Sequence, residues 1–332
     1  MTQVISKQDL LSWLGKVAEQ RIIVAPVRDG ELVLFKEISN VEDIVVGAAN
    51  TVLSPKEFFF PRSETLFTVE GKDGTSEVVP VNLDREVVLF GLRPCDAKGI
   101  VLIDKPFCAD PADTLYKQHR AMTTLVGLAC TEACADGFCT SMGSGPGDAS
   151  NVDILLTGVG DSYAIQVITD NGKALLSGAK TQEVDVSLPA PPTVSELPTD
   201  GLVEKAEKVF NNEYWSRVAD RCLHCNVCAY VCPTCYCFDI RDYNDRGRIQ
   251  RVRAWESCQS PGFTKIAGGH NPRANKGARL RQRWYHKFLY FPHQFDAEVA
   301  CTGCGRCVRS CPVNIDIREI IRDIQSLEAP SD

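Results

Sequence analysis

The chain has 332 residues, of which 44% are hydrophobic, 24% are charged and 16 are cysteines. This length predicts a globular protein of two or three domains. The sequence lacks both a run of 18 apolar residues and a signal-peptide pattern at its start, so we expect a cytoplasmic protein without a membrane span. In a reducing cytosol, 16 cysteines favour metal ligation over a disulfide framework.

The net charge of −7 conceals an uneven distribution. Residues 241–290 contain 12 basic and 3 acidic residues, a local charge of +9, so the rest of the chain carries −16. We call this segment the basic insert.

The first 185 residues show a mixture of helical and strand patterns. Leucines at helical spacing predict a helix over 6–20, capped by Ser6. Two apolar runs around Arg28-Asp29-Gly30 predict a hairpin, and a second hairpin is expected around 158–161. Between them, a strand over 85–95, two helical segments and a strand over 123–130 fit a parallel crossover unit.

The second half of the chain shows a different pattern. Four prolines in a stretch poor in periodic apolar residues mark a linker over 186–200. A helix is expected from Leu202 onwards, and isoleucines at helical spacing from Ile317 to Ile324 predict a closing helix. We therefore predict an α+β protein: a mixed α/β domain with hairpins over 1–185, the linker, and an α-helical domain over 201–332.

The decisive motif is a cysteine spacing that occurs twice. Both copies have the form C-x2-C-x2-C-x3-C-P, starting at Cys222 and at Cys301. In this bacterial 4Fe–4S run, three close thiolates bind one cluster and the fourth reaches across to the other. The first predicted ligand set is Cys222, Cys225, Cys228 and Cys311, and the second is Cys301, Cys304, Cys307 and Cys232. The domain over 201–332 is therefore expected to be ferredoxin-like, with two 4Fe–4S clusters.

Zinc is the alternative occupant, since two-residue cysteine spacings also build zinc sites with four thiolates. Zinc gives no reason for the third cysteine, the proline or the duplication, so we favour clusters. A purely structural role for the clusters is the other alternative, although paired cubanes usually conduct electrons.

A second group of cysteines follows the predicted parallel strands. Cys95 and Cys130 lie where the two strands end, at one edge of the sheet, and the loop after Cys130 adds Cys134 and Cys139. The four thiolates could hold a third cluster. Their spacing is irregular, and the alternative is that they are small buried or free thiols.

Four cysteines remain. Cys235, Cys237 and Cys258 could form a further thiol site that binds a metal or a persulfide, or could line a cluster pocket and tune its potential. Cys108 has no companion and is expected to be a packing residue.

The basic insert alternates arginines with aromatic residues, as nucleic-acid-binding surfaces do. It lies between the two cluster motifs, however, and an oxidised cubane with four thiolates carries a net charge of about −2. We therefore expect its cations to compensate cluster charge or to dock an acidic partner, and we expect no nucleic-acid and no membrane partner.

Several further motifs resemble one family. FFFPRSETLF (58–67), GLRPCDAKGI (91–100), GFCTSMGSGPG (137–147), CPTCYCFDI (232–240) and GHNPR (269–273), together with both cysteine runs, are similar to the iron–sulfur subunits of sulfhydrogenases (the β chain), of anaerobic sulfite reductase and of flavin oxidoreductases coupled to heterodisulfide reductase. The similarity extends over about residues 50–320.

The resemblance implies an electron-transfer component of a multi-subunit oxidoreductase. Such a component relays electrons between a partner that oxidises NAD(P)H with FAD and a catalytic partner of the hydrogenase, sulfite reductase or heterodisulfide reductase type. FAD and NAD(P) are then expected on the partner, and this chain is expected to be non-catalytic by itself. The alternative is a catalytic role, in which the chain reduces a sulfur compound at cysteines outside the two runs.

Overall fold

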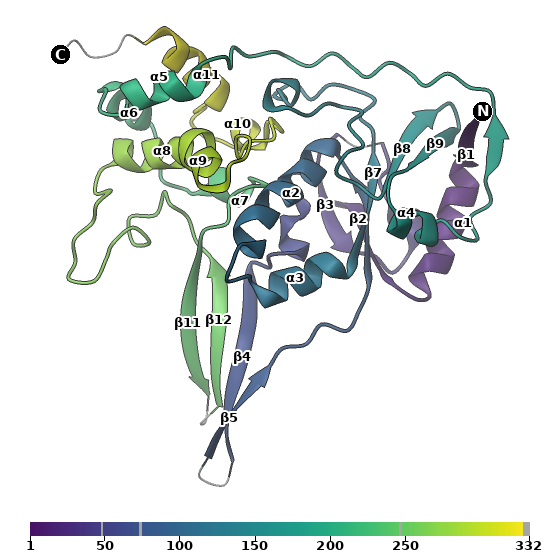
Figure 1. Ribbon diagram of the computed structural model, residues 1–332, viewed down its shortest axis with the longest axis horizontal. Coiled ribbons are helices and arrows are strands. Elements are labelled where there is room, and N and C mark those ends of the chain that lie inside the picture. Colours follow the sequence, from purple (N-terminus) through teal and green to yellow (C-terminus); the bar gives the residue numbers. More distant parts are fainter. Residues whose placement is uncertain (48, 73–74, 246–247, 328–332) are drawn as a thin grey trace.

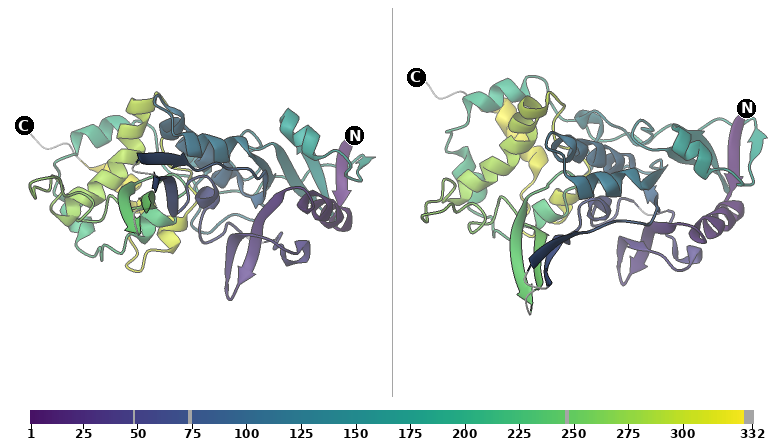
Figure 2. Two further views of the ribbon diagram at one scale, coloured as in Figure 1. Left: turned by 90° about the horizontal axis from the view of Figure 1, so that it is seen from below. Right: turned by 60° about the horizontal axis from the view of Figure 1, so that its bottom comes forward.

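The computed structural model describes residues 1–47, 49–72, 75–245 and 248–327 of the chain. The molecule is elongated, with a mixed α/β part at one end, a helical part at the other and an arm of long strands projecting between them (Figure 1, Figure 2). Among the described residues, no helix combines the length and the apolar character needed to cross a membrane.

The α/β part is built on one eight-stranded sheet. In spatial order its strands are β10 (Gln182–Val184), β1 (Thr2–Ser6), β9 (Ser162–Val167), β8 (Ile154–Val159), β7 (Thr123–Leu128), β6 (Val87–Leu92), β2 (Ile22–Asp29) and β3 (Leu32–Glu37). The four central strands β8, β7, β6 and β2 are parallel, and the outer strands are antiparallel to their neighbours.

Both predicted hairpins are confirmed. Strands β2 and β3 pair antiparallel around Gly30, and β8 and β9 pair around Gly160. Each glycine has φ of 60°, a conformation that a tight hairpin turn needs and that other residues adopt only at a cost.

The predicted crossover unit is also confirmed, because β6 and β7 are parallel neighbours joined by α2 (Pro94–Cys108) and α3 (Thr114–Ala121). These two helices bury Ile103 and Tyr116 against one face of the sheet. Helix α1 (Lys7–Ala18), capped by Ser6 as expected, buries Trp13 and Leu14 on the other face, where α4 (Asp170–Leu175) also packs.

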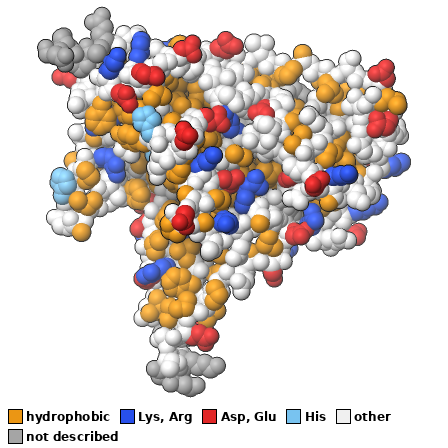
Figure 3. Space-filling view, in the orientation of Figure 1, with side chains coloured by type: hydrophobic (Ala, Val, Ile, Leu, Met, Phe, Trp, Pro, Cys, Tyr) orange, Lys and Arg blue, Asp and Glu red, His pale blue; other side chains and the backbone are white. Residues whose placement is uncertain are grey.

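The arm is a four-stranded sheet that the sequence did not predict. Its spatial order is β11 (Phe238–Asp245), β12 (Arg248–Trp255), β4 (Ser63–Lys72) and β5 (Thr75–Pro80). The expected domain over 201–332 therefore contains two strands as well as helices, and one of them, β12, pairs with β4 from the N-terminal half. Hydrophobic side chains are visible on the outside of the arm (Figure 3). Val78, Tyr243 and Ile249 are exposed hydrophobic residues of its strands.

Short helices make up the rest of the C-terminal part. They are α5 (Leu202–Lys208), α6 (Tyr214–Ala219), α7 (Val227–Tyr230), α8 (Lys276–Tyr285), the π-helical η4 (His286–Tyr290), α9 (Phe291–Phe295), α10 (Arg306–Arg309) and α11 (Ile317–Ser326). The closing helix is α11, which buries its isoleucines against Trp215, Trp284 and Phe288. The helix expected from Leu202 is divided into α5 and α6.

Single-turn 3₁₀ helices and one long irregular segment complete the chain. The 3₁₀ helices are η1 (Val41–Asp43), η2 (Pro55–Phe58) and η3 (Thr140–Met142). The expected linker over 186–200 has neither helix nor strand and runs along the molecule from β10 to α5 (Figure 1). It buries Val194 and Leu197, and the amide of Leu197 donates to the hydroxyl of Ser141 at 2.8 Å, so the segment is packed against the protein.

Candidate metal centres

The two cysteine runs fold into the same local structure. His224 and Asn226 in the first run, and Gly303 and Gly305 in the second, have positive φ angles between 54° and 74°. In each run these residues stand two and four positions after the first cysteine and lead into a one-turn helix, α7 or α10. The left-handed residues turn the backbone twice, which lets closely spaced thiols point toward one centre.

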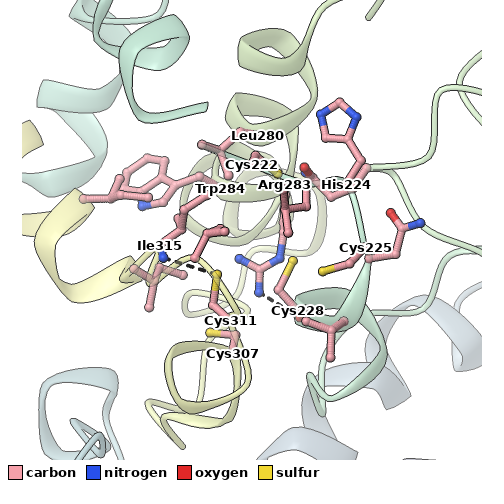
Figure 4. A pocket seen from close by; sticks show the side chains of 17 residues that line it. Cys222, His224, Cys225, Cys228, Leu280, Arg283, Trp284, Cys307, Cys311 and Ile315 are labelled. Atoms are coloured by element: carbon pink, nitrogen blue, oxygen red, sulfur yellow. Dashed lines mark hydrogen bonds between the residues drawn. The ribbon is translucent and has the colours of Figure 1, made fainter. Parts of the chain in front are cut away.

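A cavity in the helical part collects cysteines from both runs. It is lined by the first predicted ligand set and by one cysteine of the second: Cys222, Cys225, Cys228, Cys311 and Cys307. In Figure 4, Cys228, Cys307 and Cys311 lie around the guanidinium of Arg283. The fourth cysteine of the second run thus lies beside the first three of the first run, as an exchange of ligands between the runs requires.

Arg283 supplies positive charge to this cavity. The side chain is buried and donates a hydrogen bond to the carbonyl of Cys228 at 3.0 Å. Burial lowers the pKa of Arg283, but Cys228 and Cys307 outweigh that effect and raise it above its usual value. A permanently protonated guanidinium at this position would offset the negative charge of a bound cluster.

The second predicted set is assembled next to the first. Cys301, Cys307 and Cys232 are electrostatic neighbours, and Cys304 is a neighbour of Cys307. Burial raises the pKa of Cys301 to about 12 and that of Cys307 to about 11. The metal-free thiols are therefore neutral at pH 7, and metal binding at this set would release protons.

A second cavity contains the third cysteine group. Cys95, Cys130, Cys134 and Cys139 all line it, together with Cys304 of the second run. Cys95 lies in the first turn of α2 just past β6, and Cys130 follows β7, so the parallel sheet brings both to the same edge. Burial raises the pKa of Cys130 to about 11, which again describes a neutral thiol in the absence of metal.

The loop after Cys130 is fixed directly against the second cysteine run. A Cβ atom at Gly303 would lie 2.5 Å from the carbonyl carbon and oxygen of Phe138, and one at Gly305 would lie 2.5 Å from the carbonyl oxygen of Asp136. The amide of Phe138 donates to the carbonyl of Gly303 at 2.8 Å. Only glycine allows this backbone approach, which places the third cysteine group beside Cys304.

The three remaining cysteines of the predicted thiol site also meet. Cys237 precedes β11 and Cys258 follows β12, so the hairpin brings their thiols into hydrogen-bond contact, and Cys235 contacts Cys232 in the same way. The hydrogen bond from Cys258 lowers the pKa of Cys237 to about 7. Cys108, expected to be a packing residue, is instead exposed at the end of α2.

Two buried lysines that the sequence motifs did not single out flank this region. Lys56 of η2 donates to the carbonyls of Cys235 at 2.8 Å and Ala229 at 3.3 Å, and its ammonium lies 4.2 Å from the ring centre of Trp255. Burial lowers the pKa of Lys56 to about 8. Lys287 contacts Cys232. Lys56 lies just before the aromatic residues Phe58 to Phe60, and Lys287 lies just before the largely aromatic segment Phe288 to Phe291. A cation next to aromatic residues is a sequence signal that could have identified both lysines.

Across the described part of the chain, no three His, Cys, Asp or Glu side chains are close enough together to hold one metal ion. The cysteines of the third group, and all those of the two runs except Cys232 and Cys301, are instead distributed around the two cavities described above.

Comparison with known proteins agrees with the cysteine motifs. A family model described as "4Fe-4S dicluster domain" matches residues 221–315. The chain is 29% identical over 328 residues to a protein named sulfhydrogenase 2 subunit beta from Pyrococcus furiosus, and the match covers 94% of this chain and 95% of that protein. No solved structure matches the chain. The chain therefore contains a 4Fe–4S dicluster domain and is similar over nearly its whole length to a sulfhydrogenase β subunit, and both findings support an electron-transfer subunit of an oxidoreductase.

Proposed function

We propose that this chain relays electrons through three 4Fe–4S clusters. The relay connects a catalytic partner of the hydrogenase, sulfite reductase or heterodisulfide reductase type with a partner that contains FAD and oxidises NAD(P)H. The first and second clusters are assigned to the two exchanged ligand sets of the cysteine runs. The third is assigned to Cys95, Cys130, Cys134 and Cys139. Each bound cluster would supply a carrier for one electron at a time.

The observation that carries the proposal is the continuity of the three cysteine groups. Cys307 lines the first cavity, and Cys304, three residues earlier, lines the cavity of the third group. The second run thus borders both other groups, which would place its cluster in the middle of the relay. Electron transfer requires carriers that lie next to one another. Clusters with a purely structural role would not need to be neighbours.

The surrounding side chains fit an anionic cofactor at each place. Arg283 lies in the first cavity, Lys287 contacts Cys232, and Arg306 is an electrostatic neighbour of Cys95 and Cys304. All three are buried. Buried cations are costly unless negative charge is near. Asp96 supplies that charge to Arg306, whereas clusters with thiolate ligands would supply it to Arg283 and Lys287.

Iron analysis and spectroscopy of the anaerobically purified native complex test this proposal. We expect about twelve iron atoms on this chain, four for each cluster, and visible absorbance that bleaches when NAD(P)H is added to the complex. Identification of the other subunits would name both partners. Zinc in near-stoichiometric amounts, or iron that NAD(P)H does not reduce within the complex, would contradict the relay.

The third cluster needs a separate test because its ligand spacing is irregular. We expect Cys134→Ala to lower the iron content from about twelve to about eight atoms per chain while both signals of the cysteine runs remain. Cys108→Ala, which alters an exposed thiol outside all the cavities, is the matched control. An unchanged iron content in Cys134→Ala would remove this residue from the ligand set.

A catalytic role at the thiol site is a second candidate, favoured by the hydrogen bond that lowers the pKa of Cys237 to about 7 and makes it a better nucleophile. The chemically reduced chain should then turn over polysulfide or sulfite without its partners. Cys237→Ser should abolish that turnover and leave the signals of both cysteine runs intact. Absence of turnover in the reduced wild-type chain would eliminate this candidate.

A further inference from the structure

Lys287 is a buried ammonium directed at one cluster-ligand candidate. Its side chain is 3% exposed, and it belongs to the π-helical turn η4 that follows α8. Such π-helical turns inside helices occur frequently at functional sites. The ammonium donates to the sulfur of Cys232 at 3.1 Å, to the hydroxyl of Thr234 at 2.8 Å and to the carbonyl of Ala300 at 3.2 Å.

These contacts fix the position and the charge of Lys287. The three hydrogen-bond donors of an ammonium match its three acceptors, so the group has a single defined orientation. None of the three acceptors is a carboxylate, and Cys232 is the partner able to carry a full negative charge.

We propose that Lys287 raises the reduction potential of the cluster held by Cys232, Cys301, Cys304 and Cys307, through a charged N–H···S hydrogen bond to the Cys232 sulfur. This inference rests on the relay proposed above. Reduction adds one negative charge next to the ammonium, so a fixed positive charge at this distance favours the reduced state. Hydrogen bonds to ligand sulfurs act in the same direction.

We expect the effect on the reduction potential to be specific to one cluster, because the buried cations differ in the atoms to which they donate hydrogen bonds. Lys287 is bonded to the sulfur of Cys232, whereas Arg283 is bonded to the backbone carbonyl of Cys228 and not to its sulfur. Lys56 also bonds to backbone carbonyls. Lys287 is therefore expected to act mainly on the potential of the middle cluster of the relay.

The test is an EPR-monitored redox titration of the intact complex containing Lys287→Met, which removes the charge and all donors at similar side-chain length. We expect the midpoint potential of one cluster to fall by at least about 59 mV, which corresponds to a tenfold change in its one-electron reduction equilibrium, and the other midpoint potentials to stay unchanged. Lys276→Met is the matched control. It removes a positive charge from the same basic insert at an exposed position, where the ammonium donates only to the carbonyl of Asp220.

Unchanged midpoints in a Lys287→Met complex that retains its iron would overturn the inference and leave the relay standing. If Lys287→Met loses the middle cluster, Lys287→Gln, which keeps a donor but not the charge, is titrated instead. A midpoint equal to that of the wild type would again overturn the inference. Failure of the relay is separately visible, because the wild-type complex would then show no cluster signals that NAD(P)H reduces.

Discussion

Arg306 and Asp96 form an ion pair that is fully enclosed by protein. Two hydrogen bonds join the guanidinium to the carboxylate, at 2.6 Å and 3.1 Å, and each side chain is at most 1% exposed. Arg306 also donates to the carbonyl and hydroxyl of Thr51. Because Asp96 follows Cys95 and Arg306 precedes Cys307, the pair joins the third cysteine group to the second run.

Removal of one partner leaves the other charge buried. We expect Asp96→Ala to lower the free energy of unfolding by about 3–5 kcal/mol, since the guanidinium of Arg306 would lose its countercharge. The double variant Asp96→Leu with Arg306→Met should recover most of that loss. Urea unfolding of the cluster-loaded chain measures both. A single variant as stable as the wild type would show that the pair does not contribute to stability.

The contact between the two loops depends on glycine. We expect Gly303→Ala to separate the loop 134–139 from the second run and to reduce the iron content by about four atoms, because a methyl group would lie 2.5 Å from backbone atoms of Phe138. Gly160→Ala is the control: its φ is equally positive, at 60°, but no atom lies within 4 Å of the added methyl. Equal iron in the two variants would contradict the prediction.

The exchange of ligands between the cysteine runs predicts paired effects. Cys311→Ala should remove the same EPR signal as Cys225→Ala, because both residues line the first cavity. Cys232→Ala should instead remove the signal that Cys301→Ala removes, because those two thiols are electrostatic neighbours. If Cys311→Ala and Cys301→Ala remove the same signal, each run binds its own cluster and our assignment is incorrect.

His286 gives the chain a defined sensitivity to acid. Burial and the cations Lys287 and Arg273 lower its pKa to about 4, from an ordinary value of about 6.5. Below pH 6.5 the unfolded chain binds a proton that the folded chain does not bind until about pH 4, so stability falls as the pH decreases through this window and is unaffected above it.

At pH 5.5 this difference amounts to about 1.4 kcal/mol. We therefore expect the wild type to lose about that much more stability than His286→Gln when the pH is lowered from 7 to 5.5. Urea unfolding of both proteins at both pH values provides the comparison, and acid damage common to the two proteins cancels in the difference. Identical losses would show that His286 is not held neutral.

The sequence predicted those features that depend on local patterns. The crossover unit and both hairpins followed from apolar runs, and the cysteine spacing alone indicated the iron–sulfur domain. The grouping of Cys95 with Cys130 followed from one general rule, that parallel strands end at a common edge.

Features that depend on distant segments were not predictable in this way. Arg253 and Glu64 form an ion pair across the arm, 189 residues apart, in a segment whose many arginines indicate a basic surface when the sequence is considered alone. The alternation of apolar and polar residues that predicts a strand is not visible there, because Arg253 occupies a buried position. Its guanidinium lies over the ring of Phe60. Arg306 gives no local signal for a similar reason, since its partners Asp96 and Thr51 lie on distant segments.

The arm also determines when the protein can fold during its synthesis. Strand β12 pairs with β4 across about 180 residues, for example Ile249 with Val69. Until the ribosome has released residue 255, β4 and β5 form a two-stranded ribbon in which the edge of β4 is open to other chains. A nascent chain interrupted between residues 80 and 248 would consequently be prone to aggregate, and the segment that closes this edge lies between the two cysteine runs.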